Sequence, residues 1–527
     1  MRIFIHLLRH HLGGRLVTAS SLADASGLSY GTAMRSLDDL VKRGLIIKRP
    51  RTVSGKSFSL HPSAGLLDQW QKFEQRVKSM VDSKFARENI EEPTAYDING
   101  GVPVASRVVP PPAALEKKLN LTRGLRILVH ADPTFVAMNS LRKQFEMIFG
   151  VEIRSRALSI DRLRAEIIDN SLAKSSRYDI IACDLPWFGE MAAAGRLLAL
   201  DPLINESEFD RRDFHADALA SACYWGVQYG IPILTTAEIL VYRTDLFAGA
   251  GIAPPTTAAE TLSAVRALHR PAAGLSGIAW NGGRGTPLGH TFIMVMGAFG
   301  QPVVNLRRLP NGFDAETVSG EQLRPMFMSD AARDTAEYLR ELVQYSPPNI
   351  LRMTWYDRAM AYAQGKVASA YSHSLLAQLY ELNESSPAYR MTGYLPHPAG
   401  PQGAPIVPLG GYALAIPANI ERERIGAVWT ALRTLTSPSA AKLYAANGSL
   451  AWSRFSIIRD QEIRSISPMI PAVDQMARRS LLRMWPRPPI AEISDVIGIA
   501  GQEIHDMLSG LKSINQALTN AQNRSDA

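Results

Sequence analysis

The sequence predicts a multidomain chain in which a small α+β module precedes a large α/β body. Three observations predict this: an uneven distribution of charge, a helix–helix–hairpin pattern in the first 62 residues, and alternating strands and helices after residue 125. The 527 residues exceed one ordinary domain, and 46% hydrophobic and 20% charged residues are typical of a soluble protein with sizeable cores.

The charge is concentrated at one end of the chain. Residues 1–61 contain ten Lys and Arg against three acids, a net charge of +7, whereas the whole chain carries +8. The remaining residues are therefore nearly neutral. A basic end on a neutral body is the pattern expected when that end contacts a polyanion.

The first 44 residues predict three helices. Apolar residues recur at helical spacing over Arg2–Leu12. Ser21, with an acid three residues later, predicts the start of a short helix that ends at Gly27. Ser29 is expected to cap a further helix, which ends at Gly44. Two short helices joined by a glycine turn form a helix-turn-helix.

The last of these helices has an outward face suited to DNA. Residues near the start of such a helix reach base edges when the helix lies in the major groove. Arg35 can bind guanine bidentately, and Asp39, four residues later, is expected to orient it. The expected DNA contacts of this helix are Ser29, Tyr30, Thr32, Arg35 and Ser36.

A β-hairpin is predicted next, with strands at 45–49 and 57–60 and a basic tip between them. With this order and the wording LADASGLSYGTAMRSLDDLVKRGLI, residues 1–62 resemble the winged helix-turn-helix of bacterial transcription regulators. In that family the wing contacts phosphate or the minor groove, a role that the resemblance gives to Arg49, Arg51 and Lys56. A winged helix used only for protein contact is the alternative, but the basic charge favours DNA.

Residues 63–90 and 91–124 are expected to connect this module to the body. The first stretch has a heptad seam of Leu66, Trp70, Phe73, Val77 and Met80, which predicts a homodimerisation helix or, equally well, a helix packed on the module. Residues 91–124 are rich in Pro and Gly and predict a linker.

The body, residues 125–527, begins with short β-rich runs that alternate with helical patterns. Strands are predicted near 126–130, 151–153 and 178–182, with a helix over 160–172 and another carrying Leu141, Phe145 and Phe149. Such alternation predicts an α/β fold with a parallel sheet.

Several separated motifs in the body have specific wording. YDIIACDLPWFGEMAAAGRLLALDPLI, YWGVQYGIPILTTAEILVYRTDLFAGAGIAPP and LGGYALAIP resemble the extracellular solute-binding proteins of ABC transporters, most of all the sugar- and polyol-binding branch. The resemblance implies two α/β lobes with a ligand cleft between them. Thr257 departs from the family, which often has Trp there.

The resemblance also implies a set of ligand-binding residues. Aromatic faces stack on sugar or polyol carbons, while carboxylates, amides and Arg bind the hydroxyls. The positions implied are Asp132, Asp184, Trp187, Glu238, Trp280, Arg284, Tyr371, His373, Gly411 and Tyr412, with Trp452 as a further candidate. The alternative for each aromatic residue is core packing, and for each charged residue a structural ion pair.

Catalysis, cofactors and metals have little support in the sequence. It contains no GxSxG, HExxH or CxxC motif, and Cys183 and Cys223 lack metal-ligand spacing. The apolar N-terminal run is broken by charged and histidine residues, so no export signal is expected, and no apolar stretch is long enough to cross a membrane. These observations predict a cytoplasmic protein that is not an enzyme.

We therefore expect a ligand-responsive transcription regulator that binds a double-stranded DNA operator as a homodimer and senses a small sugar or polyol. The alternative is an ABC transporter substrate-binding protein for sugar uptake with an atypical N-terminal domain. An enzyme is a third class, which would need a catalytic constellation that the sequence lacks.

Overall fold

The computed structural model describes residues 2–12, 16–50, 58–70, 72–73, 113–207 and 209–526. The chain forms two compact units, each built from separate stretches. Unit 1 contains residues 1–127, 135–156 and 422–447, and unit 2 contains residues 128–134, 157–421 and 448–527.

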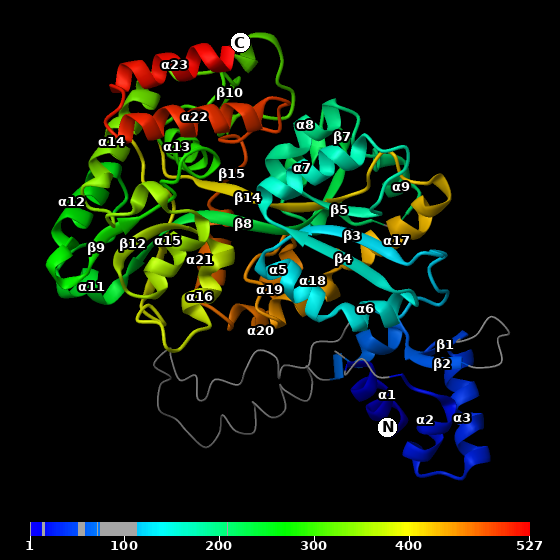
Figure 1. Cartoon of the computed structure of the whole chain (residues 1–527). Coiled ribbons are helices and arrows are strands. Elements are labelled where there is room, and N and C mark those ends of the chain that lie inside the picture. Colours follow the sequence, from blue (N-terminus) through cyan, green and yellow to red (C-terminus); the bar gives the residue numbers. More distant parts are fainter. Residues whose placement is uncertain are drawn as a thin grey trace. The chain divides into compact units, whose positions relative to one another are not determined.

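Unit 1 begins with three helices, drawn in blue in Figure 1: α1 (Arg2–Leu12), α2 (Ala19–Ser26) and α3 (Tyr30–Lys42). Helix α2 starts earlier than expected, because Thr18 and Ser21 form the capping box with each other's backbone N–H. Gly27 ends α2 with a φ of 72°, a left-handed conformation that glycine adopts without strain. Ser29 does not cap α3, since its hydroxyl bonds that of Thr32.

A two-stranded antiparallel hairpin follows, made of β1 (Ile46–Pro50) and β2 (Phe58–Pro62). Leu7, Leu22, Leu37 and Leu60 are buried together, so the helices and the hairpin share one core. Residues 64–70 are helical. Of the predicted dimerisation seam, Leu66, Trp70 and Phe73 are described, and Leu66 is buried in this core. Val77, Met80, residues 91–112 of the predicted linker, Arg51 and Lys56 lie outside the described residues.

The other helices of unit 1 are short. The helix expected around Leu141 is two helices, and Ser140 Oγ donates to the carbonyl of Ala137 at the end of the first. Such side-chain bonds to the backbone compete with continued helix. These helices are α5 (Pro133–Ser140), α6 (Arg142–Phe149), α17 (Ile425–Leu435) and α18 (Pro438–Ala446), and strands β3 (Leu125–His130) and β4 (Ile153–Leu158) have residues in both units.

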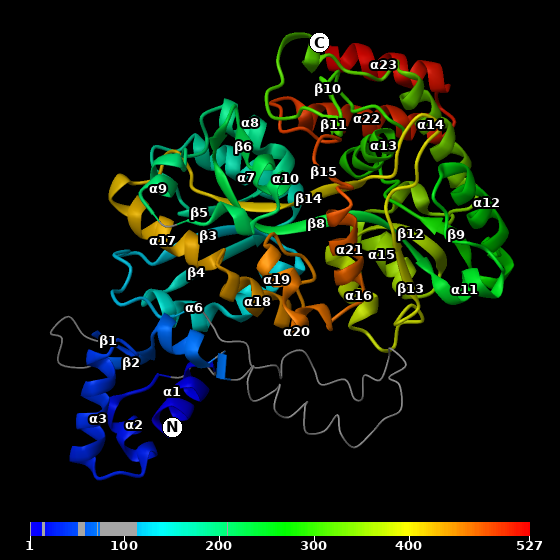
Figure 2. The ribbon, with the colours of Figure 1, turned by 180° about the vertical axis from the view of Figure 1, so that it is seen from behind.

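Unit 2 is built on a mixed sheet, whose strands hydrogen-bond in the order β5-β14-β8-β12-β9 (Figure 2). The expected parallel sheet is wrong here, because β14 runs antiparallel to both β5 and β8, and β12 runs antiparallel to β8. Strand β12 is parallel to β9, and β14 is parallel to β15. The strands are β5 (Ile180–Asp184), β8 (Gly230–Arg243), β9 (Ser276–Ala279), β12 (Val367–His373), β13 (Thr392–Leu395), β14 (Val407–Ala415) and β15 (Leu482–Arg483).

Strand β8 is 14 residues long and almost wholly buried. Its first part, residues 230–237, pairs with β14, and its second part, residues 238–242, pairs with β12. The two sets of partners do not overlap. One continuous strand therefore carries two successive parts of the sheet.

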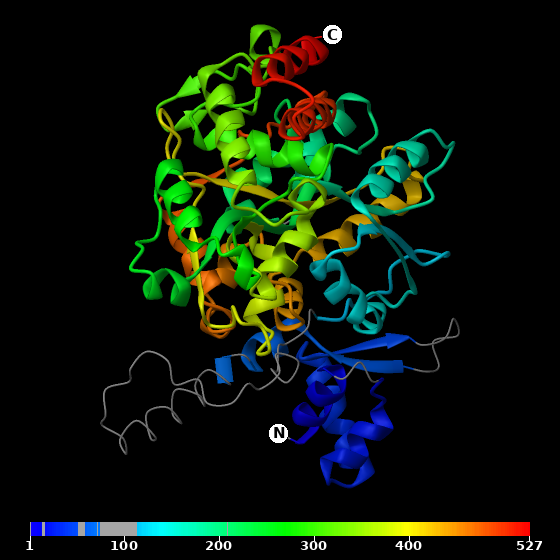
Figure 3. The ribbon, with the colours of Figure 1, turned by 60° about the vertical axis from the view of Figure 1, so that its left-hand side comes forward.

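Helices surround this sheet. The C-terminal helices α22 and α23, red in Figure 3, contact each other, and α22 also packs on α13. None of the described helices is both long and apolar enough to cross a membrane. The helices are α7 (Ile160–Ser171), α8 (Phe188–Ala193), α9 (Asp201–Asn205), α10 (Ala216–Ser221), α11 (Thr244–Gly249), α12 (Ala258–Leu268), α13 (Thr286–Ala298), α14 (Asp330–Val343), α15 (Trp355–Ala363), α16 (Gln378–Glu381), α19 (Phe455–Arg459), α20 (Gln461–Arg464), α21 (Met469–Arg478), α22 (Ile493–Leu508) and α23 (Ile514–Asp526).

Candidate functional site

Two of the predicted carboxylates lie in one buried group of unit 2. Asp184 ends β5, and Tyr412 of β14 is its antiparallel partner. Asp132 lies in the loop after β3, where it accepts the backbone N–H of Thr134 at 2.8 Å. His130 joins them, since its Nδ1 is 3.3 Å from Asp132 and its ring stacks on Tyr412 with centroids 5.1 Å apart. We call His130, Asp132, Asp184 and Tyr412 the acidic cluster.

Burial sets the charge state of this cluster. Removal from water raises the pKa of Asp184 to about 6, although Arg487 and His130 act in the opposite direction. Burial also raises the pKa of Tyr412, so its hydroxyl stays protonated. The cluster therefore offers carboxylate oxygens and a phenol within an apolar setting, the combination that binds hydroxyl groups. Trp187 is buried at the end of the 3-10 helix that directly follows Asp184.

Glu238 has a different role from the one expected. Both of its oxygens accept from the guanidinium of Arg358, at 2.5 and 3.0 Å, and Nδ1 of His373 is 2.7 Å from Oε2. Burial alone would raise the pKa of Glu238, but Arg358 and His373 together lower it well below its usual range. Glu238 and His373 are thus members of a buried ion-pair network that links β8, β12 and α15, instead of free ligand-binding groups.

Three other predicted residues are part of the core or the backbone frame. Trp280 is fully buried and donates from Nε1 to Ser346 at 2.9 Å, so it presents no face to a ligand. Tyr371 is buried, with its hydroxyl 2.8 Å from that of Tyr338. Gly411 has a φ of 131°, and an added Cβ would lie 2.3 Å from the carbonyl oxygen of Leu234. Glycine is therefore required there by the backbone.

The last two predicted residues, Arg284 and Trp452, have different surroundings. Arg284 lies at the surface before α13 and pairs with Asp506 of α22 at 3.1 Å, so it joins two helices. Trp452 is buried, and its Nε1 has no hydrogen-bond partner among the described residues. A buried indole N–H usually has a partner, so Trp452 remains a candidate donor to a ligand.

The sequence reasoning missed Arg487, His290 and Trp355. Nη1 of Arg487 is 3.2 Å from Nδ1 of His290, and the ring of His290 lies 6.0 Å from that of Trp355 in an edge-to-face arrangement. The signal for Arg487 was a single charge in the apolar run MWPRPPI. No local pattern distinguished His290 inside the apolar helix α13.

Five of the expected DNA contacts lie at the start of α3, and of the three expected in the hairpin the structure describes Arg49. Tyr30 is 61% exposed and Arg35 is exposed, with its Nη2 3.4 Å from Oγ1 of Thr32. Asp39 pairs with Arg43 at 3.6 Å and does not orient Arg35. Ser36 is half-buried.

Arg49 was expected on the wing surface, but it is 2% exposed. Its guanidinium donates to the carbonyl oxygens of Leu115, Met147 and Ile148. The last two belong to the C-terminal turn of α6, whose carbonyls lack partners within the helix. Arg49 is therefore a buried helix-capping residue within unit 1 and is not available to DNA.

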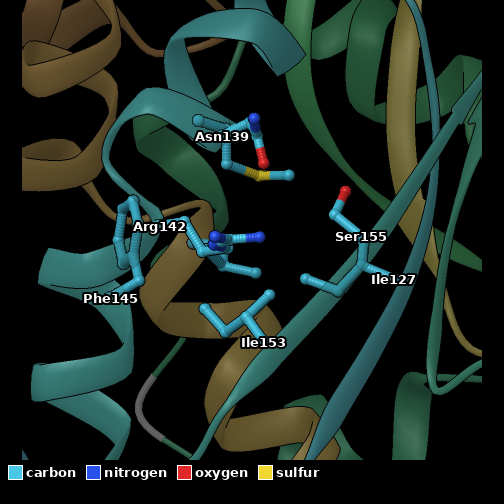
Figure 4. A pocket seen from close by; sticks show the side chains of 8 residues that line it. Ile127, Asn139, Arg142, Phe145, Ile153 and Ser155 are labelled. Atoms are coloured by element: carbon cyan, nitrogen blue, oxygen red, sulfur yellow. The ribbon is translucent and has the colours of Figure 1, made fainter.

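A small pocket of unit 1 is lined by none of the predicted ligand residues. Figure 4 shows Ile127, Asn139, Arg142, Phe145, Ile153 and Ser155 around it. Its volume of about 10 Å³ is the space of a single water molecule, too little for a sugar.

Comparison with known proteins supports the fold of the larger part of the chain. A family model described as bacterial extracellular solute-binding protein matches residues 161–442. An ABC transporter solute-binding protein from Agrobacterium radiobacter K84, in complex with ribitol, is 23% identical with a TM-score of 0.71, covering 78% of this chain and 99% of that one. Maltose-bound MalE3 of T. maritima is 19% identical with a TM-score of 0.66, covering 76% and 99%.

A third structure, a solute-binding protein of Agrobacterium vitis S4 with bound D-mannitol, is 19% identical with a TM-score of 0.63, covering 76% of this chain and 97% of that one. These similarities confirm the two-lobed α/β solute-binding fold expected for the C-terminal part. The family match contradicts the expected cytoplasmic localisation, because the matching family is extracellular.

Proposed function

Because the chain belongs to the bacterial extracellular solute-binding protein family, we propose that it binds a small sugar or polyol, or a derivative of one, for an ABC transporter. The observation that carries this proposal is the acidic cluster, in which Asp132 and Asp184 are buried beside the stacked rings of His130 and Tyr412. No cationic side chain of the described residues lies within ion-pair distance of Asp184, so its buried carboxylate suits a ligand that supplies several hydroxyl donors.

The structurally similar proteins suggest the first solutes to test. Their structures were determined with ribitol, D-mannitol and maltose, which share adjacent hydroxyl groups on a short carbon chain or ring. Adjacent hydroxyls can donate together to the oxygens of Asp132 and Asp184 while their carbons pack on an aromatic ring.

Titration calorimetry of the full chain with ribitol, D-mannitol and maltose, followed by a wider panel of neutral and acidic sugars and polyols, tests this proposal. Asp184→Asn should weaken the binding of any solute found by about tenfold or more, because it removes a charged acceptor. Asp495→Asn, an exposed acid of α22, is the matched control and should have no effect. If nothing in the whole panel binds the wild-type chain, the proposal is wrong.

A second candidate function is double-stranded DNA binding by the N-terminal module, which would make the chain a solute-responsive regulator acting as a homodimer. It is favoured by the exposed start of α3, with Tyr30 and Arg35 facing solvent, and by the net charge of +7 over residues 1–61. The burial of Arg49 removes one of the three expected wing contacts.

Fluorescence anisotropy of the full chain with labelled duplex DNA tests this second function. Binding should weaken steeply as salt concentration rises, and Arg35→Ala should reduce sequence preference by about 1–3 kcal/mol. Arg212→Ala, an exposed arginine of unit 2, is the control. If the chain does not bind DNA at low salt, the DNA-binding function is excluded, and the proposal that the chain binds a solute still stands.

A further inference from the structure

Arg487 differs from the other buried arginines of unit 2. Arg358 pairs with Glu238, Arg454 with Asp213 and Arg243 with Asp245, each at 3.1 Å or less. Arg487 is 7% exposed, and no described carboxylate lies within ion-pair distance of it. A buried guanidinium without an anionic partner is costly, so an arrangement of this kind requires an explanation.

The contacts of Arg487 leave part of its guanidinium unused. Nη1 faces Nδ1 of His290 at 3.2 Å, and Nη2 donates to the carbonyl oxygen of Leu409. Nε has no hydrogen-bond partner among the described residues. Burial lowers the pKa of His290 well below its usual range, so the imidazole is neutral and does not compensate the charge of Arg487.

Arg487 lies beside the acidic cluster. Its Nη2 would be 2.8 Å from a Cβ added at Gly410, which places the guanidinium against β14, two residues from Tyr412. Asp184 and Arg487 also influence each other's charge, although they do not form a direct ion pair. Carboxylate oxygens and an incompletely bonded guanidinium therefore border the same part of unit 2.

We infer that Arg487 binds an anionic group of the solute, a carboxylate or a phosphate, so that the solute is an acidic derivative of a sugar or polyol. This inference rests on the proposed solute-binding function. A polyhydroxy acid matches both sides of the site, since its hydroxyls donate to Asp132 and Asp184 and its anion accepts from Arg487. Residue 487 lies outside the residues 161–442 that match the family model, so the family match does not assign this role.

Binding of matched neutral and acidic solutes to the wild-type chain tests the inference without any variant. The probes are ribitol, D-ribonate, which carries a carboxylate, and D-ribitol 5-phosphate, which carries a phosphate. Calorimetry should show at least one of the two acids binding about tenfold or more tightly than ribitol. Which acid binds more tightly identifies the anionic group.

Arg487→Gln should weaken binding of the preferred acid by about tenfold or more while changing ribitol binding little. Arg483→Gln, a half-buried arginine on β15, is the matched control, and thermal melting establishes that each variant is folded. If ribitol or another neutral polyol binds as tightly as both acids, the inference is overturned and the proposed function stands. If no neutral or acidic solute binds, both are overturned.

Discussion

Asp184 is a buried carboxyl group whose charge costs stability and which we propose as a solute-binding group. Its carboxyl is buried at the end of β5, and its pKa is raised to about 6 from 3.8 because the charged form is poorly solvated there. Because the folded-state pKa is the higher one, this group favours folding most below pH 4, and the contribution is lost as pH rises through about 6.

Asp184→Asn should therefore make the solute-free protein more stable at neutral pH, by up to about 3 kcal/mol. The same change should weaken solute binding, because a charged acceptor is removed. Thermal melting of both proteins from pH 4 to 8 checks this, and the difference in stability should grow with pH and level off above about 7. If the variant and the wild-type protein are equally stable at every pH, the charge of Asp184 is compensated in the folded protein.

Arg49→Met should destabilise unit 1 by about 2–4 kcal/mol, since it leaves the buried carbonyls of Leu115 and Met147 without the guanidinium donor, while that of Ile148 keeps only the backbone N–H of Leu115. Urea unfolding followed by circular dichroism measures the change. Arg35→Met, at an exposed position of α3, is the control and should shift stability by less than about 0.5 kcal/mol. Equal effects of the two substitutions would contradict the capping role.

Single residues were the hardest part to predict from the sequence. Asp132 and Asp184 were implied by the resemblance to solute-binding proteins, and their role in binding a solute stays a prediction. Glu238 was misassigned, since its partner Arg358 is 120 positions away in the chain and no local pattern connects them. Arg49 was misassigned for the same reason, because the α6 carbonyls that it caps are almost 100 positions away.

At the scale of elements, helix ends were predicted best where backbone geometry is decisive. Gly27 and Gly44 both adopt positive φ at the turns expected for them. Caps made by side chains were predicted less well, since Thr18 took the role expected of Ser21 and several hydroxyl-bearing residues compete at these positions.

Two glycine substitutions in the N-terminal helices test whether a positive φ makes glycine necessary at a helix end. Gly27→Ala should destabilise them by about 1 kcal/mol or more, because φ is 72° and the new Cβ would lie 2.6 Å from Nη1 of Arg2. Gly31→Ala, inside α3 with no heavy atom within 4 Å of the added Cβ, should stabilise them by about 0.5–1 kcal/mol. Amide exchange in α1–α3 measures both changes in stability. If both substitutions stabilise the helices, or both destabilise them, the requirement for glycine at position 27 is not explained by its φ.

For the whole molecule, the sequence predicted an α/β solute-binding body but not the direction of its strands. Alternating strands and helices favour parallel pairing, and nothing local to β8 or β14 shows that they run antiparallel to each other. Direction depends on which strands meet in space, and the chain between β8 and β14 is more than 160 residues long.

Solute binding should protect unit 2 selectively. At a free solute concentration of about 100 times Kd, linkage adds about 2.7 kcal/mol to the free energy of unfolding. Hydrogen exchange with and without solute should show slower exchange in β5, β8 and β14, which carry or adjoin the acidic cluster, and little change in α1–α3. Protection confined to α1–α3 would place the solute elsewhere.

The division of β8 has a mechanical consequence. Its pairing passes from β14 to β12 at the peptide bond between Ala237 and Glu238, and no residue of β8 pairs with both strands. A strand clamped along each half but not across the junction bends most easily at that junction. Any tilting of one part of the sheet against the other is therefore concentrated beside Glu238, where the two hydrogen bonds from Arg358 resist it.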